Sequence, residues 1–189
     1  MILMGWLVGI SFGFGLLVGS FLNVVIHRMP LGESVVHPGS HCPGCDNPIK
    51  PWDNIPIVSF ALLGGSCRHC QARISWRYPL IELLTGVLFA AVAMRFGWSP
   101  LTPLWMAFAA ALFAVAVIDL DHQIIPDEIS LGGLVLGLVG MPFVHTQLGA
   151  SWPEALRFVG LGALVGGGAL WIVGFAHARI CLLYTSDAA

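Results

Sequence analysis

Five long apolar runs alternate with shorter polar segments along the chain. They lie at residues 3–26, 79–96, 101–118, 128–145 and 157–177. Each is close to the roughly 17–25 residues that a helix needs to cross the hydrocarbon layer of a bilayer. Because lipid offers the backbone no hydrogen-bond partners, apolar runs of this length are expected to be helical. The pattern predicts an all-α, multi-pass membrane protein with about five spanning helices.

The composition agrees with this class. Of the 189 residues, 57% are hydrophobic and only 10% are charged, whereas charged residues make up about 25% of a soluble domain. The net charge of −2 indicates no nucleic-acid partner, and membrane lipid is the expected surrounding. The first run has neither a cationic segment before it nor a small-residue cleavage site after it, so we interpret it as a retained spanning helix.

The longest polar segment, residues 27–78, separates the first apolar run from the second. Six basic residues lie in it or after the fifth run, and two lie on the other side of the predicted helices: Arg28, Lys50, Arg68, Arg73, Arg77 and Arg179 against Arg95 and Arg157. Basic residues favour the cytoplasmic side of a membrane. We therefore predict that loop 27–78 is cytoplasmic and that the third run returns the chain to that side.

Four cysteines in this loop form two C-x2-C pairs, Cys42 with Cys45 and Cys67 with Cys70. Two such pairs supply the four thiolates of a tetrahedral structural zinc site. The 21 residues between the pairs slightly exceed the usual spacing of about 15–20. Disulfides or thiol–disulfide exchange are the alternatives, although a reducing cytoplasmic loop disfavours lasting disulfides. We predict that Zn²⁺ folds this loop.

Three carboxylates lie between the third run and the fourth. Asp119 directly follows the apolar run, Asp121 and His122 follow in a polar turn, and Asp127 is the expected N-cap of the fourth helix. An ionisable group at the membrane edge is costly and is therefore a functional candidate. Desolvation there would favour the protonated form of Asp119, as an acid–base catalyst requires.

Small and polar residues in the first two runs indicate how the helices pack. The first run contains two small-x3-small patterns, Gly9–Gly13 and Gly15–Gly19, which are typical of close helix contacts in membranes. Asn23 near the end of this run is expected to be a packing or hydrogen-bonding residue rather than a catalytic one. Glu82, one turn into the second run, is expected to pair with a basic residue such as Arg77, and binding of a substrate or cofactor is the alternative.

Four motifs, in order, resemble those of bacterial type IV prepilin peptidases. They are residues 19–30 (GSFLNVVIHRMP), the two cysteine pairs, residues 81–85 (IELLT) and residues 118–127 (IDLDHQIIPD). The resemblance covers about residues 5–178. It implies an inner-membrane aspartyl endopeptidase that removes the leader of type IV prepilins and type II secretion pseudopilins. Many members also N-methylate the new N-terminus with S-adenosylmethionine, which is therefore an expected cofactor.

The resemblance also implies the catalytic residues. In this family two aspartates at the membrane edge activate a water, and the first of them matches Asp119. The second belongs to a Gly-x-Gly-Asp motif on a later helix, whereas residues 166–169 read Gly-Gly-Gly-Ala. Since the family has about eight spanning helices, we expect this chain to match the N-terminal two-thirds of a member and to be inactive alone.

The expected organisation has four parts. They are a first spanning helix at 1–26, the zinc loop with the methyltransferase-associated region at 27–78, the N-terminal part of the peptidase membrane domain at 79–180, and a tail at 181–189 that is not expected to be native. No glycine-rich nucleotide loop after a strand is visible, so the sequence does not locate the methyl-donor site. A non-catalytic zinc-loop membrane protein of pilus or secretion assembly is the alternative function.

Overall fold

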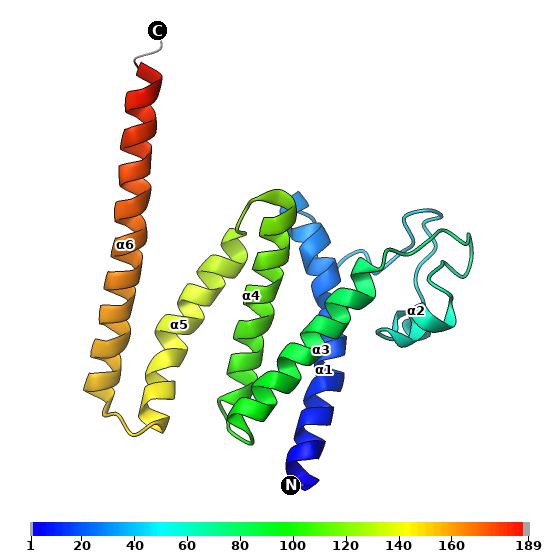
Figure 1. Cartoon of the computed structure of the whole chain (residues 1–189), viewed down its shortest axis with the longest axis horizontal. Coiled ribbons are helices and arrows are strands. Elements are labelled where there is room, and N and C mark those ends of the chain that lie inside the picture. The colour runs from blue at the N-terminus through cyan, green and yellow to red at the C-terminus, as the bar shows by residue number, and fades with distance from the viewer. Residues whose placement is uncertain (1, 187–189) are drawn as a thin grey trace. The chain divides into compact units, whose positions relative to one another are not determined.

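The computed structural model describes residues 2–186, which are mostly helical (Figure 1). In order, the elements are α1 (Ile2–Arg28), η1 (Met29–Leu31), η2 (Pro51–Asn54), α2 (Val58–Leu62), α3 (Arg77–Phe96), α4 (Thr102–His122), α5 (Asp127–Gln147) and α6 (Trp152–Ser186). Five of these helices are long and apolar enough to cross a membrane. The predicted all-α architecture with five candidate spans is confirmed. The chain divides into two units at residues 130 and 131, which are described separately.

Close contact between α1 and α3 organises the first unit. A Cβ atom added at Gly19 would lie 2.6 Å from the Cα of Glu82, and one added at Gly15 would lie 2.8 Å from the Cα of Gly86. The two helices are therefore antiparallel and touch backbone to backbone, as small residues one turn apart allow. The Gly9–Gly13 pattern, in contrast, faces open space within the described part of the chain. Only the second of the two predicted patterns packs here.

Helix α4 packs on this pair through one stripe of residues at four-residue spacing. Met106, Ala110, Ala114 and Ile118 are buried and belong to the same apolar core as residues of α1 and α3. The helix continues past the end of the apolar run to His122. It stops there because the next residue, Gln123, adopts a left-handed conformation. The prediction of a polar turn from residue 121 is therefore wrong, and the last turn of α4 carries all the polar residues from 119 to 122.

In the second unit, aromatic contacts join the end of α5 to the start of α6. The rings of Phe143 and Trp152 lie 5.2 Å apart, and those of His145 and Phe158 lie 4.5 Å apart. Helix α6 continues to Ser186. It therefore extends past residue 177, where the fifth apolar run ends, while residues 187–189 of the predicted tail lie outside the described residues.

Candidate functional site

Each cysteine pair lies in its own backbone turn, and the two turns have the same conformation. They are 25 positions apart in the sequence. The Cys42 N–H donates to the Asn47 carbonyl at 3.0 Å, and the Cys67 N–H donates to the Ala72 carbonyl at 2.9 Å. An isolated antiparallel bridge closes each turn. The residue after the second cysteine has a positive φ in both turns (55° at Asp46 and 61° at Gln71). Loop 27–78 thus contains two equivalent knuckles that present their thiols to each other.

The four sulfur atoms form one cluster. All lie within 4.8 Å of one another, and the Sγ atoms of Cys42 and Cys70 are 3.7 Å apart. A tetrahedral zinc site with Zn–S bonds of about 2.3 Å places its sulfurs about 3.8 Å apart. A disulfide would need a separation of about 2.05 Å, and all four cysteines are free thiols. The donor set and its spacing therefore fit a tetrahedral metal ion such as Zn²⁺.

The thiols also influence one another electrostatically. The backbone N–H groups of Cys70 and His69 lower the pKa of the Cys67 thiol to about 6. The N–H of Ala72 lowers the pKa of Cys70, but burial and the three neighbouring sulfurs outweigh it and raise that pKa to about 11. Four adjacent thiols cannot all ionise in the absence of a cation. A bound dication removes this conflict, because it deprotonates the thiols that coordinate it.

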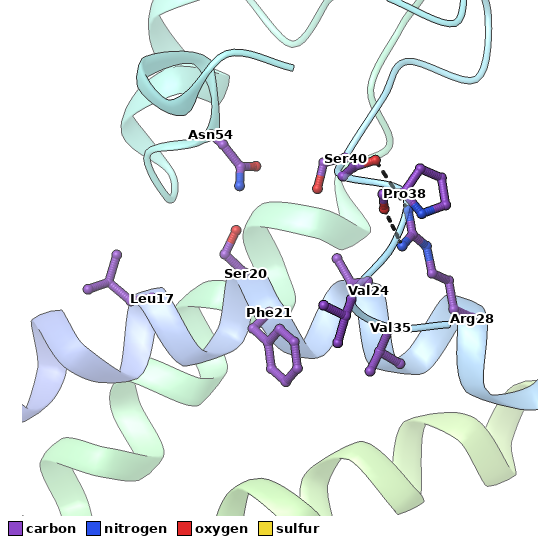
Figure 2. Close-up of a pocket in the computed structure, with 11 residues that line it drawn as sticks. Leu17, Ser20, Phe21, Val24, Arg28, Val35, Pro38, Ser40 and Asn54 are labelled. Carbon is purple, nitrogen blue, oxygen red and sulfur yellow. Dashed lines mark hydrogen bonds between the residues drawn. The ribbon is translucent and has the colours of Figure 1, made fainter. Parts of the chain in front are cut away.

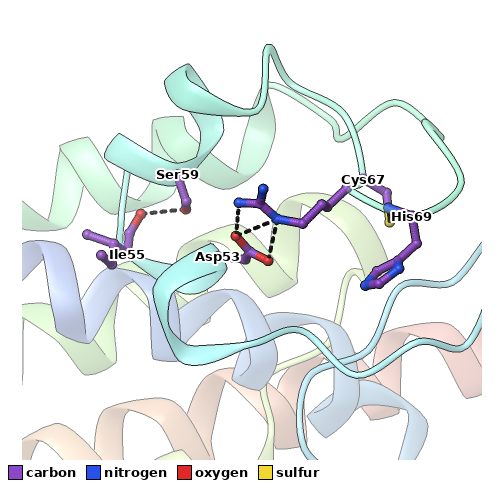
Figure 3. Close-up of polar contacts among 6 residues, drawn as sticks. Asp53, Ile55, Ser59, Cys67 and His69 are labelled. Atoms are coloured by element: carbon purple, nitrogen blue, oxygen red, sulfur yellow. Dashed lines mark hydrogen bonds and ion pairs between the residues drawn. The ribbon is translucent and has the colours of Figure 1, made fainter.

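An ion pair joins η2, which lies between the two knuckles in the sequence, to the second knuckle. The Arg68 guanidinium donates to both carboxylate oxygens of Asp53 at 2.6–3.1 Å (Figure 3). This guanidinium lowers the pKa of the Asp53 carboxyl. A few residues later, the Ser59 hydroxyl donates to the Ile55 carbonyl at 2.6 Å. Bidentate arginine–carboxylate pairs fix orientation as well as distance, so η2 is held against the second cysteine turn.

Glu82 anchors the loop to the helices. Glu82 is only 8% exposed, and its carboxylate accepts a hydrogen bond from the Ile57 N–H at 2.8 Å. Ile57 has a φ of 61°, which is unfavourable for a β-branched residue and requires support from its surroundings. The predicted pairing of Glu82 with Arg77 is wrong, because Arg77 pairs with Asp121 instead.

Arg28 is a second anchor, which the sequence analysis did not identify. It is buried at the end of α1. Its Nη1 donates to the carbonyls of Ser34 and Pro38 at 3.0 and 2.7 Å, and its Nη2 donates to that of Gly39 at 3.4 Å. These carbonyls compensate for the burial of the guanidinium. The first residues of loop 27–78 are consequently held against α1.

Asp119 lies in the last turn of α4. A pocket of about 300 Å³ at this end of the first unit is lined by the end of α1, the start of α3 and the end of α4 (Asn23, Ile26, His27, Ser75, Arg77, Tyr78, Ile81, Asp121 and His122). Asn23 forms the predicted hydrogen bond, donating to the Tyr78 carbonyl at 3.1 Å. The loop therefore begins and ends beside the helix end that carries Asp119.

The structure differs from two expectations about the carboxylates. The Asp119 side chain is exposed, so the described residues do not provide the desolvation expected for it. Asp127 is the first residue of α5 rather than the residue before the helix. As an acidic residue in the first turn, it still complements the positive end of the helix dipole.

The five apolar helices are typical of a multi-pass membrane protein, and the four clustered thiols of its loop could hold a metal ion. Two family models match it: the Bacterial Peptidase A24 N-terminal domain over residues 14–96, and the Type IV leader peptidase family over residues 106–186. Together they span most of the chain. The chain belongs to the type IV leader peptidase family.

Curated relatives agree with this assignment. The chain is 43% identical over 183 residues to the prepilin leader peptidase/N-methyltransferase of Neisseria gonorrhoeae, a match that covers 84% of this chain and 62% of the relative. The proteins of the same name from Pseudomonas aeruginosa and Myxococcus xanthus are 41% and 45% identical, with 84% and 82% of this chain and 60% and 44% of the relatives covered. The chain thus spans about half to three-fifths of the length of these relatives. No solved structure matches it.

Proposed function

We propose that the protein containing this chain is an aspartyl endopeptidase of the bacterial inner membrane. It removes the leader of type IV prepilins and type II secretion pseudopilins and N-methylates the new N-terminus with S-adenosylmethionine. The observation that carries the proposal is the position of Asp119 at the helix end beside which loop 27–78 begins and ends. Family membership and the names of the relatives support it.

In this proposal the loop faces the cytoplasm, as does the end of α4. A prepilin with a basic leader before an apolar helix would then present its scissile bond at the cytoplasmic membrane edge. Asp119 would supply one of two carboxyl groups that share a proton, because two close carboxylates cannot both ionise. The ionised carboxyl takes a proton from the water that attacks the scissile carbonyl, and the protonated one donates to the leaving amine.

The acidic residues around Asp119 have a secondary role in this proposal. Asp121, Asp127 and Glu128 would attract the basic residues of the leader, each by about 1 kcal/mol or less, as is usual for exposed pairs. The four cysteines would hold Zn²⁺ with no open coordination position, so the metal folds the loop and does not activate water.

A cleavage assay tests the proposal. Asp119→Asn would be compared with Glu33→Gln, which neutralises an exposed carboxylate in the loop. Both variants would be made in the gene that encodes this chain, with any coding sequence that follows it included. A prepilin would be co-expressed. Because loss of an acid–base group costs about 10²–10⁴-fold in rate, we expect Asp119→Asn to abolish measurable processing and Glu33→Gln to leave it intact. Normal processing by Asp119→Asn would exclude the catalytic assignment.

The same assay addresses the alternative function. A non-catalytic zinc-loop protein of pilus or secretion assembly would show no leader cleavage in any variant, although zinc would still bind the loop. Relatives named as peptidases favour the enzyme.

A further inference from the structure

The η2–α2 segment (residues 51–62) is an apolar part of an otherwise polar loop. Residues 54–67 contain no charged side chain. The large apolar side chains of the segment are nevertheless exposed: Leu62 is 82% exposed and Trp52 is 60% exposed, and Ile55 and Val58 are exposed as well. Exposed apolar patches mark interaction sites, and the proposed peptidase chemistry does not use this one.

The segment lies beside the apolar parts of α1 and α3, not beyond their ends. Asn54 and Ser20 point toward one another across a cavity of about 270 Å³ (Figure 2), and the Ile57 N–H donates to Glu82. Ser20 is eight residues from the end of α1, or about 12 Å along the helix axis. The 27 residues of α1 measure about 40 Å, and a bilayer is about 40–45 Å thick with its head groups and about 30 Å without them. When α1 crosses such a bilayer, the segment lies near the boundary between head groups and acyl chains.

The hydrogen bond to Glu82 explains how irregular backbone can lie at this depth. A backbone N–H close to the acyl chains is costly unless a protein group accepts its hydrogen bond. Ile57 is the N-cap of α2, and the N–H groups at the start of a helix have no partner within that helix. The Glu82 carboxylate accepts the Ile57 N–H at 2.8 Å. The same bond gives an ionisable residue inside an apolar helix a partner.

Aromatic side chains lie where a membrane interface would place them. Trp76 directly precedes α3 and is 77% exposed. The Phe60 ring of α2 packs edge-on against the Trp76 ring, with the ring centroids 4.7 Å apart, so the end of α2 lies level with the start of α3. At η2, the Lys50 Nζ lies 5.5 Å from the centre of the Trp52 ring. Tryptophan favours the membrane–water interface, and a lysine there meets the anionic head groups.

We propose that the η2–α2 segment lies in the head-group layer of the bilayer, with the side chains of Trp52 and Leu62 against the acyl chains of phospholipids. The proposal goes beyond the proposed function and rests only on α1 and α3 crossing a bilayer. Asp53 pairs with Arg68, so the one acidic residue of the segment faces the second knuckle and not the lipid. Backbone in the head-group layer remains in contact with water. The loop is thus attached to the membrane at its middle as well as at its two ends, and this attachment holds the knuckles at the membrane surface.

Photolabelling from the lipid tests the proposal. The zinc-loaded protein, with any coding sequence that follows this chain included, would be placed in nanodiscs of phosphatidylethanolamine and phosphatidylglycerol. A small share of the lipid would carry a diazirine on its acyl chain, and labelled positions would be mapped by peptide mass spectrometry. Trp52→Glu and Leu62→Glu place a charge in the patch, and Trp52→Phe and Leu62→Met are the matched controls. Zinc content, measured for each variant, reports whether the loop is folded.

We expect residues 51–62 of the wild type to be labelled at least about fivefold more strongly than the knuckles at residues 42–47 and 67–72. Each glutamate variant should lower labelling of residues 51–62 by at least about fivefold with unchanged zinc content, and the matched controls should be labelled like the wild type. Labelling of residues 51–62 no stronger than that of the knuckles would overturn the proposal, because a protein surface or water would then cover the patch. If the glutamate variants lose zinc, the labelling pattern of the wild type decides by the same criterion.

Discussion

Substitution of Gly19 by alanine tests the contact on which the first unit is built. The new Cβ would lie 2.6 Å from the Cα of Glu82 and 3.1 Å from the Ile81 carbonyl oxygen. Carbon atoms in contact prefer about 3.5–4.0 Å, so α1 and α3 must separate locally by about 1 Å. The obstructing atoms belong to the backbone, and no side-chain rotation can remove the clash.

Overpacking of this kind costs about 1–3 kcal/mol. Replacing glycine by alanine in a helix recovers about 1 kcal/mol, so we expect a net loss of up to about 2 kcal/mol. Gly9→Ala is the matched control, because its Cβ would meet nothing within 4 Å in the described part of the chain. This control should be neutral or stabilising by up to about 1 kcal/mol.

The assay is reversible unfolding of the two variants and the wild type in detergent, followed by circular dichroism. A loss of 1.4 kcal/mol corresponds to a tenfold change in the folding equilibrium. The displaced α3 should also weaken the Glu82–Ile57 hydrogen bond, which would make the loop more sensitive to protease. Equal stability of Gly19→Ala and Gly9→Ala would refute the backbone contact between α1 and α3.

Three further predictions concern the loop and the pocket lined by Asp121 and His122 at the end of α4. Cys70→Ser should reduce bound zinc from about one equivalent to a small fraction and expose loop 27–78 to protease, because three thiolates do not complete the tetrahedral site. Glu82→Gln replaces a charged acceptor by a neutral one, which costs about 1 kcal/mol, and should raise protease cleavage within residues 51–62 about fivefold. Asp121→Asn breaks an exposed ion pair with Arg77, so it should change stability by less than about 1 kcal/mol while weakening the preference for basic leaders.

Each of these predictions has a result that would contradict it, and the zinc prediction also has a control. Ser59→Ala, on α2, should leave zinc bound, and full zinc content in Cys70→Ser would contradict the four-sulfur site. For Glu82→Gln, the contrary result is unchanged proteolysis of the loop. For Asp121→Asn, the measured quantity is how strongly processing depends on the charge of the leader. If this dependence were the same as in the wild type, Asp121 would not attract the leader.

The sequence predicted the features that depend on local pattern. Hydrocarbon thickness sets the length of a spanning helix, so five apolar runs were sufficient to predict five candidate spans. The spacing of Cys42, Cys45, Cys67 and Cys70 predicted a cluster, because a two-residue gap places both thiols on one side of a turn. Asn23 is expected either to pack or to form a hydrogen bond, and the structure shows the hydrogen bond, because a buried amide requires a partner.

The sequence did not reveal contacts between distant residues. Charge suggested an arginine as the partner of Glu82, but its carboxylate accepts a hydrogen bond from the Ile57 N–H. That donor depends on how the loop folds back, which no local pattern records. The carbonyl partners of Arg28 were missed for the same reason. The end of α4 was placed too early, because hydropathy marks where the apolar run stops and not where the backbone leaves the helix.

The central claim is that Asp119 and loop 27–78 face the same compartment, so that the proposed catalytic acid and the metal-folded loop act on one side of the membrane. Labelling of introduced cysteines tests it: His122→Cys reports the end of α4, and Ser59→Cys reports the loop. A membrane-impermeant maleimide would be applied to intact spheroplasts and to inverted vesicles, and labelled peptides would be identified by mass spectrometry. We predict that both positions react in inverted vesicles and neither reacts in spheroplasts. Reaction of the two positions from opposite sides of the membrane would contradict the claim.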